Sequence, residues 1–298
     1  MSAALLRDLR AALEEGGLRG SFLVRDLRSG AELGIEPDRE YPIASLVKVP
    51  LAAATLDRIH RGELDAATPL EVEPGGVTTP GPTGLTRFRH PARIALGDLL
   101  YLSTSLSDGT AADVLFGLTP PPEITRRLGE WGLPGIAVRH VMRDLVETPA
   151  ERFDAAEADL AQALAIGAAT PGGHRLPQLD VTRANAASAR ALLGLLQALW
   201  TPSKIAPPVA AGVRELMADN VIRHRLTPDF ASDAARWSSK TGTLLNMRHE
   251  MGVVEHADGG AFAVVALTES SVPAAIQPEA EVLMSRVARA LRDELRGG

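Results

Sequence analysis

The spacing of apolar residues changes twice along this chain. Between residues 21 and 35, and again between 237 and 268, apolar and polar residues alternate as in β-strands, whereas the region from 94 to 217 has the three-to-four-residue spacing of helices. A helix is expected at each end of the chain, from Ser2 and from Pro278. Strands from both ends can therefore form one antiparallel sheet beside the terminal helices, with a helical lobe inserted between them.

These patterns predict an α/β (α+β) protein of one domain with two subdomains. We expect an α/β subdomain from residues 1–40 and 205–298 and a helical subdomain from 41–204. An amphipathic helix is expected from Asn185 to Leu199. Residues 72–91 are rich in proline and glycine, and a loop of this length is expected to form the rim of a site.

Composition restricts the classes of partner. The net charge of −6 argues against nucleic acid or an anionic membrane as the main partner. The chain has no run of about 20 apolar residues, so no membrane span is expected. The chain has no cysteine, no zinc-protease motif and no nucleotide-binding loop, so we expect neither a metal nor a cofactor. The N-terminus has no signal-peptide core, which indicates a cytoplasmic protein, although a secreted protein without its leader has the same appearance. We expect a monomer that acts on a small molecule.

A serine precedes a lysine by three residues at the start of an apolar segment. Residues three apart on a helix share one face, so the Ser45 hydroxyl and the Lys48 amine can meet. A serine hydroxyl needs a neighbouring base to become a nucleophile, and a buried lysine can serve because burial lowers its pKa. The chain has only three lysines, so a lysine at this position indicates specific chemistry.

Two further motifs follow in order. Ser107-Asp108-Gly109 lies between two expected helices, and Lys240-Thr241-Gly242 lies on the first strand after the helical region. With Ser45 and Lys48, this arrangement resembles the class A β-lactamases and penicillin-binding peptidases, whose signature is S-x-x-K, S-D-N and K-T-G. The resemblance covers most of the chain except about residues 135–180. It implies a β-lactamase/transpeptidase-like fold, with an antiparallel sheet flanked by terminal helices and an all-helical lobe.

The resemblance also implies catalytic roles. Ser45 would attack an amide or ester carbonyl, and Lys48 would take or relay its proton. Ser107 would pass a proton to the leaving nitrogen, while Lys240 would hold Ser107 and attract a substrate carboxylate.

Substrate binding is assigned in the same way. The family's oxyanion hole has two backbone N–H groups, which correspond here to those of Ser45 and Thr243. The hydroxyls of Thr241 and Thr243, on either side of Gly242, would bind the carboxylate and its edge.

The chain departs from the family pattern in two places. Gly109 stands where the family has an asparagine that contacts the lysine and the substrate amide, so penicillin turnover is put in doubt. The family's Glu-x-x-x-Asn loop, which supplies the deacylating base, has no clear copy. Glu147 is the best-placed candidate, with Glu151 and Glu157 behind it.

Other charged residues are weaker candidates. Arg248 and His249 are expected in a turn after the third motif, where they could attract a carboxylate; an exposed turn explains them equally well. Arg223 is expected on a helix that faces the same strand and could be structural. His140 and His174 are expected to be surface or satisfied buried histidines.

Three functions remain open at this point. The first is a serine hydrolase of the β-lactamase type, acting on β-lactams through a Ser45 acyl-enzyme. The second is a peptidase or esterase on the same scaffold, with a D-Ala-D-Ala-like or related amide or ester as substrate. The third is a sensor that is acylated or occupied without turnover, which Gly109 and the missing glutamate motif favour.

Overall fold

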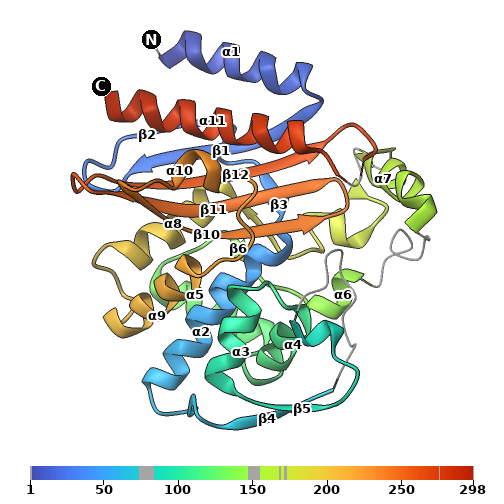
Figure 1. Ribbon diagram of the computed structural model, residues 1–298, viewed down its shortest axis with the longest axis vertical. Helices are drawn as coiled ribbons and strands as arrows, with labels where there is room; N and C mark the ends of the chain where they lie inside the picture. Colours follow the sequence, from blue (N-terminus) through green and yellow to red (C-terminus); the bar gives the residue numbers. More distant parts are fainter. Residues whose placement is uncertain are drawn as a thin grey trace.

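A five-stranded antiparallel sheet forms the centre of the protein. The computed structural model describes residues 2–73, 84–146, 155–167, 169–170, 173–274 and 276–297. In the sheet the strands follow the order β10-β11-β12-β1-β2 (Figure 1). Their bounds are β1 Leu18–Asp26, β2 Glu32–Ile35, β10 Ala235–Leu244, β11 Met247–His256 and β12 Ala261–Ser270. The first strand pairs with the last, from Leu18 with Ser270 to Asp26 with Phe262, so the two ends of the chain build one sheet as expected.

The other described elements are helices and short strands. The helices are α1 Ser2–Glu15, α2 Lys48–His60, α3 Leu96–Thr104, α4 Gly109–Leu118, α5 Pro121–Trp131, α6 Met142–Val146, α7 Ala158–Gly167, α8 Ala189–Trp200, α9 Pro207–Ala218, α10 Thr227–Phe230 and α11 Pro278–Gly297. The 3-10 turns are η1 Ala44–Val47, η2 Gly84–Arg87, η4 Ala155–Glu157 and η5 Pro177–Leu179. The remaining strands of the described residues form smaller sheets. One has the order β3 Glu40–Pro42, β9 Ala186–Ser188 and β6 Ile136–Ala137. Another pairs β4 Pro69–Val72 with β5 Ala92–Ala95, and another pairs β7 Ala169–Thr170 with β8 Gly173–His174.

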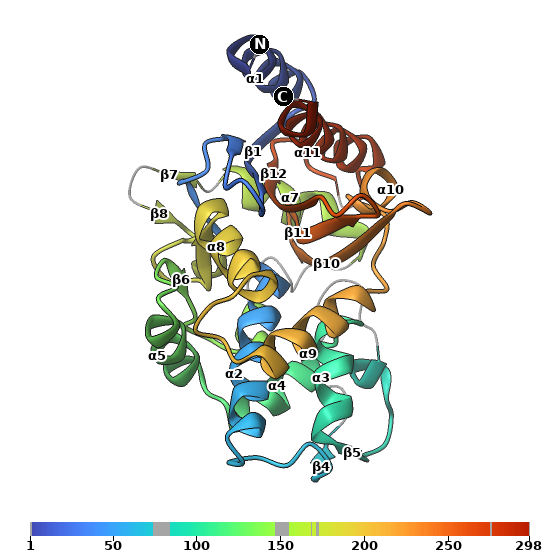
Figure 2. The ribbon, with the colours of Figure 1, turned by 90° about the vertical axis from the view of Figure 1, so that its left-hand side faces the viewer.

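Alternation along the strands gives the sheet two buried faces. On β1, Phe22 and Val24 join a core formed with α1 and α11, whereas Leu23 joins the larger core shared with the helical lobe. Figure 2 shows α1 and α11 stacked on one side of the sheet, with α8 and the helical lobe on the other. The predicted fold class is therefore confirmed. The residue bounds of the two subdomains stay a prediction.

Two local expectations are wrong. The helix expected from Asn185 begins at Ala189, because Ala186–Ser188 form β9, where Ala187 pairs with Tyr41 of β3. The Ser188 hydroxyl then caps α8 by accepting a hydrogen bond from Ala191 N. The turn expected at Arg248 and His249 lies earlier in the chain: Leu245 and Asn246 form a two-residue turn that joins β10 directly to β11.

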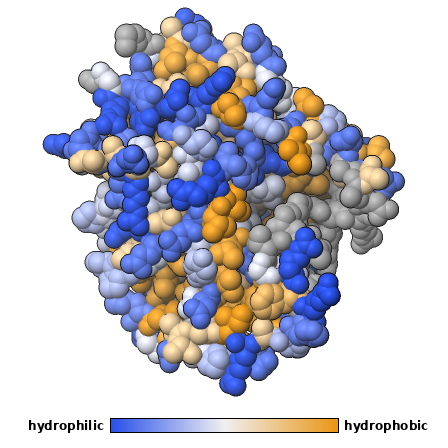
Figure 3. Space-filling model, viewed as in Figure 1, coloured by the Kyte–Doolittle hydropathy of each residue, from blue (hydrophilic) through white to orange (hydrophobic). Residues whose placement is uncertain are grey.

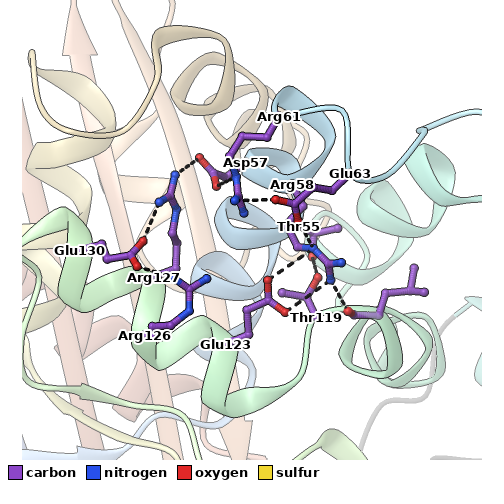
Figure 4. Close-up of polar contacts among 11 residues, drawn as sticks. Thr55, Asp57, Arg58, Arg61, Glu63, Thr119, Glu123, Arg126, Arg127 and Glu130 are labelled. Atoms are coloured by element: carbon purple, nitrogen blue, oxygen red, sulfur yellow. Dashed lines mark hydrogen bonds and ion pairs between the residues drawn. The ribbon is translucent and has the colours of Figure 1, made fainter.

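Ion pairs fix the outer end of α2 to α5. The Asp57 side chain, 3% exposed, lies 2.6 Å from Arg127 Nη2 of α5 and 2.9 Å from Arg61 Nε of its own helical end (Figure 4). Arg58 Nε also lies 3.4 Å from Glu123 Oε1 of α5. The Asp57–Arg127 pair ties α2 to α5, because loss of Arg127 would leave the buried carboxylate with its partner from the same helical end alone. The helix that begins at Lys48 is thereby anchored at its far end.

One face of the protein is largely polar. Figure 3 shows hydrophilic residues over most of one face and a hydrophobic band down its centre. In the described residues, no helix is both long and apolar enough to cross a membrane.

Candidate active site

Ser45 lies where the 3-10 turn η1 leads into α2. Lys48 is the first residue of α2, and side chains three residues apart in a 3-10 turn lie on the same side. Ser45 is partly exposed, whereas Lys48 is 1% exposed and its helix is buried over the first two turns. Within the described part of the chain, Ser45 Oγ has no hydrogen-bond partner and the Lys48 amine bonds to Ser107 instead. The hydroxyl is thus available to a ligand.

The two lysines converge on Ser107. Lys48 Nζ donates to Ser107 O at 2.6 Å and lies 3.4 Å from Ser107 Oγ. Lys240 Nζ, from β10, lies 2.9 Å from the same Oγ and donates to Thr241 O at 2.9 Å. The loop between α3 and α4, the start of α2 and the strand β10 therefore meet at one hydroxyl. These are the three motifs of the sequence: Lys48 precedes Ser107 by 59 residues, and Lys240 follows Ser107 by 133.

Strained backbone surrounds this junction. Ala44, directly before Ser45, has φ +45, and Ser107 has φ +62. Leu245, at the turn after β10, has φ +45. Side chains with a Cβ disfavour this left-handed region, and such residues persist where the surrounding structure enforces them, commonly at functional sites.

Gly242 lets β10 approach the serine. A Cβ at this position would lie 2.9 Å from Ile43 O and 3.2 Å from Leu46 Cγ. Backbone packing this close to η1 requires glycine. The third motif therefore sets the distance between the strand and Ser45.

Asp108 organises the second motif. Its buried carboxylate caps α4 by accepting from Thr110 N and Ala111 N, and it also accepts from Leu85 N at 2.5 Å and Thr86 Oγ1 at 3.2 Å. One side chain thus holds the Ser107 loop, the start of α4 and the η2 turn together. The structure describes 84–91 of the loop expected as a rim; its part from 74 to 83 lies outside the described residues.

Burial favours the neutral form of both lysine amines. Burial lowers the pKa of Lys48 to about 8, partly opposed by the negative charges of Asp108 and Asp113. Burial also lowers the pKa of Lys240 well below its ordinary value, and the positive charges of Lys48 and Arg225 add to this effect. A lysine poised near neutral pH is suited to accept a proton from a serine.

Arg225 is a site residue that the sequence reasoning missed. Its guanidinium, from a side chain 3% exposed, donates to Gly242 O at 2.8 Å, His249 O at 2.9 Å and Thr243 Oγ1 at 2.7 Å. The expectation for Arg223 is wrong, because Arg223 is exposed and lies outside any helix. Arg223 and Arg225 are two residues apart in the sequence, and only the fold shows that Arg225 is the one that contacts β10.

The expectation for Arg248 and His249 also needs correction. Both lie in β11, where Arg248 pairs with Thr243, and not in a turn. Arg248 Nη1 donates to Leu245 O and Met247 O. His249 is fully buried: its Nε2 donates to Pro42 O, its Nδ1 accepts from Thr268 N, and burial lowers its pKa to about 3. His249 therefore supplies no positive charge at neutral pH.

The deacylating base is not located among the described residues. Glu147 and Glu151 lie outside them, and Glu157 is exposed in η4. Asp113 accepts from Met142 N and Arg143 N at the start of α6, so its carboxylate serves as a cap. Gly109 is the buried first residue of α4 and offers no side chain to Lys48. His140 and His174 are both hydrogen-bonded, to Asn185 N and Ala165 O respectively.

Comparison with known proteins decides the family. The model of the β-lactamase enzyme family matches residues 4–295. The chain belongs to the β-lactamase enzyme family. This family member is 65% identical over 307 residues to the β-lactamase regulatory protein BlaB of Streptomyces cacaoi, an alignment that covers 99% of this chain and 98% of BlaB.

Solved structures share the fold of this β-lactamase family member. A β-lactamase from Chitinophaga pinensis matches with a TM-score of 0.77 at 18% identity, covering 98% of this chain and 99% of that one. A mutant of PBP-A in an acyl-enzyme complex with penicillin G matches with a TM-score of 0.77 at 18% identity, covering 99% and 97%. A variant of the class A β-lactamase of the last common ancestor of Gram-negative bacteria has the same score and identity, covering 99% of each chain.

Proposed function

We propose that this protein reacts with β-lactams or related small amides and esters through a covalent acyl-enzyme on Ser45. The observation that carries the proposal is the chain of contacts from Lys48 through Ser107 to Lys240, with the pKa of Lys48 lowered to about 8. A neutral Lys48 is a base, and the partly exposed Ser45, three residues before it, is the nucleophile.

Ser45, Lys48 and Ser107 together balance the protons of this reaction. Ser45 Oγ forms a bond to the carbonyl carbon as its proton passes to Lys48. The carbon–nitrogen bond then breaks, and the leaving nitrogen takes a proton from Ser107. Ser107 recovers its proton from Lys48, which took one from Ser45 and lies 3.4 Å from the Ser107 hydroxyl, while Lys240 holds that hydroxyl at 2.9 Å.

Binding of a carboxylate-bearing substrate follows from the charge of the site. Arg225 is a buried cation that donates to Thr243 Oγ1 at 2.7 Å, and the buried Lys240 amine, on the same strand as Thr241, is a further hydrogen-bond donor for a carboxylate. The backbone N–H groups of Ser45 and Thr243 are proposed to form the oxyanion hole.

We propose that the acyl-enzyme is long-lived and that the protein acts as a sensor. Gly109 cannot supply the amide that the family places beside the substrate. Asp108 and Asp113, the carboxylates whose charges act on Lys48, already accept backbone N–H groups. The name of BlaB, a regulatory protein, agrees with this role. The second candidate is a hydrolase in which Glu147, Glu151 or Glu157 activates the water; a peptidase or esterase would use the same serine on another small substrate.

The test separates acylation from turnover. Wild type and Ser45→Ala are mixed with a penicillin and a chromogenic cephalosporin, and intact mass and product absorbance are followed together. The sensor predicts a persistent adduct on wild type, no adduct on Ser45→Ala and little product. Rapid Ser45-dependent product would instead support the hydrolase, and Glu147→Gln should then trap the adduct. Neither adduct nor product would refute β-lactams as ligands, and small esters would be tested next.

A further inference from the structure

A second cavity lies apart from Ser45. It has a volume of about 340 Å³ and is lined by residues of β1, β3 and α7, the turn between β10 and β11, and the end of β12. None of Ser45, Lys48, Ser107 and Lys240 lines it. Figure 1 shows α7 beyond the end of the sheet at which β12 finishes. The volume is within the range of cavities that bind small molecules.

Two arginines at this cavity keep hydrogen-bonding capacity. Arg19 Nη1 and Arg39 Nη2 each lie 3.7 Å from Glu269 Oε1, which is an ion-pair distance but too long for a hydrogen bond. Their side chains are 63% and 44% exposed. Arg39 Nη1 also lies 3.5 Å from Glu36 Oε2. Each guanidinium still retains N–H groups that can bind an anion, and two of them suit a carboxylate.

Two buried polar atoms at the same cavity have no partner within the described residues. Tyr41 is 2% exposed and its hydroxyl makes no hydrogen bond. Asn246 is 6% exposed; its Nδ2 donates to Ser270 O at 3.0 Å, while its Oδ1 is unpaired. Buried polar groups are normally hydrogen-bonded, and an unpaired one costs about 1–3 kcal/mol. An unused donor and an unused acceptor thus belong to residues that line the same cavity as the two arginines.

The charges around the cavity indicate what would satisfy these groups. Besides the two arginines, the carboxylates of Glu40, Asp180 and Glu269 line it. A simple anion would be repelled by the carboxylates, and a simple cation by the arginines. A molecule that carries both a carboxylate and an ammonium or amide N–H matches the whole lining.

We propose that this cavity is a second binding site, for a small zwitterion of amino-acid or dipeptide size. Its carboxylate lies between Arg19 and Arg39 and accepts from the Tyr41 hydroxyl. Its N–H groups donate to Asn246 Oδ1 and face Glu269. The site does not depend on the proposed chemistry of Ser45.

Glycylglycine and alanylalanine are the probes for titration calorimetry with the full chain. Their N-acetylated methyl esters, which lack both charges, are the matched control ligands. We expect saturable binding of the free dipeptides only, in wild type and equally in Ser45→Ala. The double variant Arg19→Met with Arg39→Met should weaken binding by about tenfold or more. No saturation up to roughly 10 mM, or unchanged affinity in the double variant, would overturn the proposal.

Tyr41→Phe tests the site without dependence on a charged residue. Because the hydroxyl is unpaired, its removal should leave the melting temperature unchanged or higher, while dipeptide affinity falls. A lower melting temperature with unchanged affinity would contradict the assignment. In wild type, amide chemical shifts should change around Asn246 upon titration. Changes confined to the surroundings of Ser45, or binding lost in Ser45→Ala, would place the ligand at the other site and refute the second one.

Discussion

The pH dependence of acylation follows from the burial of Lys48. Burial lowers the pKa of this amine from 10.5 to about 8, a difference equivalent to about 3 kcal/mol in favour of the neutral form. About one molecule in ten then has a neutral Lys48 at pH 7, and about nine in ten at pH 9. If neutral Lys48 accepts the Ser45 proton, the rate of acylation should rise about tenfold from pH 6 to pH 7 and level off above about pH 8.

Stopped-flow measurement of adduct formation with a chromogenic cephalosporin gives this profile. Lys48→Arg preserves the charge but cannot lose its proton, so it should abolish acylation at every pH. Stability provides an independent check. Because the pKa of Lys48 is lower in the folded state, the unfolded chain binds more protons between about pH 8 and 10.5, and the free energy of unfolding should rise with pH in that window relative to Lys48→Met. A flat acylation profile, or an active Lys48→Arg variant, would refute the role of Lys48 as base.

Three further substitutions test the scaffold of the site. Gly242→Ala places a Cβ 2.9 Å from Ile43 O and should lower the free energy of unfolding, measured with urea, by about 1–3 kcal/mol. The control Gly117→Ala, whose Cβ has no atom within 4 Å, should not lower it. Equal losses in both variants would contradict the steric argument. Asp108→Ala removes the α4 cap and leaves Leu85 N unpaired, so urea unfolding should show a loss of about 2 kcal/mol, and an unchanged midpoint would count against it. Arg225→Lys should slow acylation by a carboxylate-bearing β-lactam about tenfold, with a smaller effect on an uncharged ester; an equal loss for both would assign Arg225 a purely structural role.

The sequence predicted those features that depend on local pattern. Alternation along 237–243, 250–255 and 261–268 located the three long strands, and Gly259, with φ +84, ends the hairpin between the last two. The helix expected from Ser2 ends at Glu15, shortly before Gly17, which takes φ +67. The three motifs were read from residue type and order, and the fold brings them together.

Features that depend on long-range contacts were not predictable. Ala186 and Ala187 fit a helix as well as a strand, and only pairing with Tyr41 and Pro42 selects the strand. The turn at Leu245 and Asn246 has no glycine to mark it, although Leu245 takes a positive φ. His249 reads as a charged residue in sequence, but its two ring nitrogens are satisfied by groups brought from residues 42 and 268.

The central claim is that Ser45 forms the covalent bond. Peptide mapping by tandem mass spectrometry, after brief exposure of the wild-type protein to a penicillin, tests it most directly. We expect the mass of the intact penicillin on the peptide that contains Ser45, with fragments that place it on that hydroxyl, and an unmodified peptide in Lys48→Arg. An adduct on another residue, or an equal adduct in Lys48→Arg, would contradict the account.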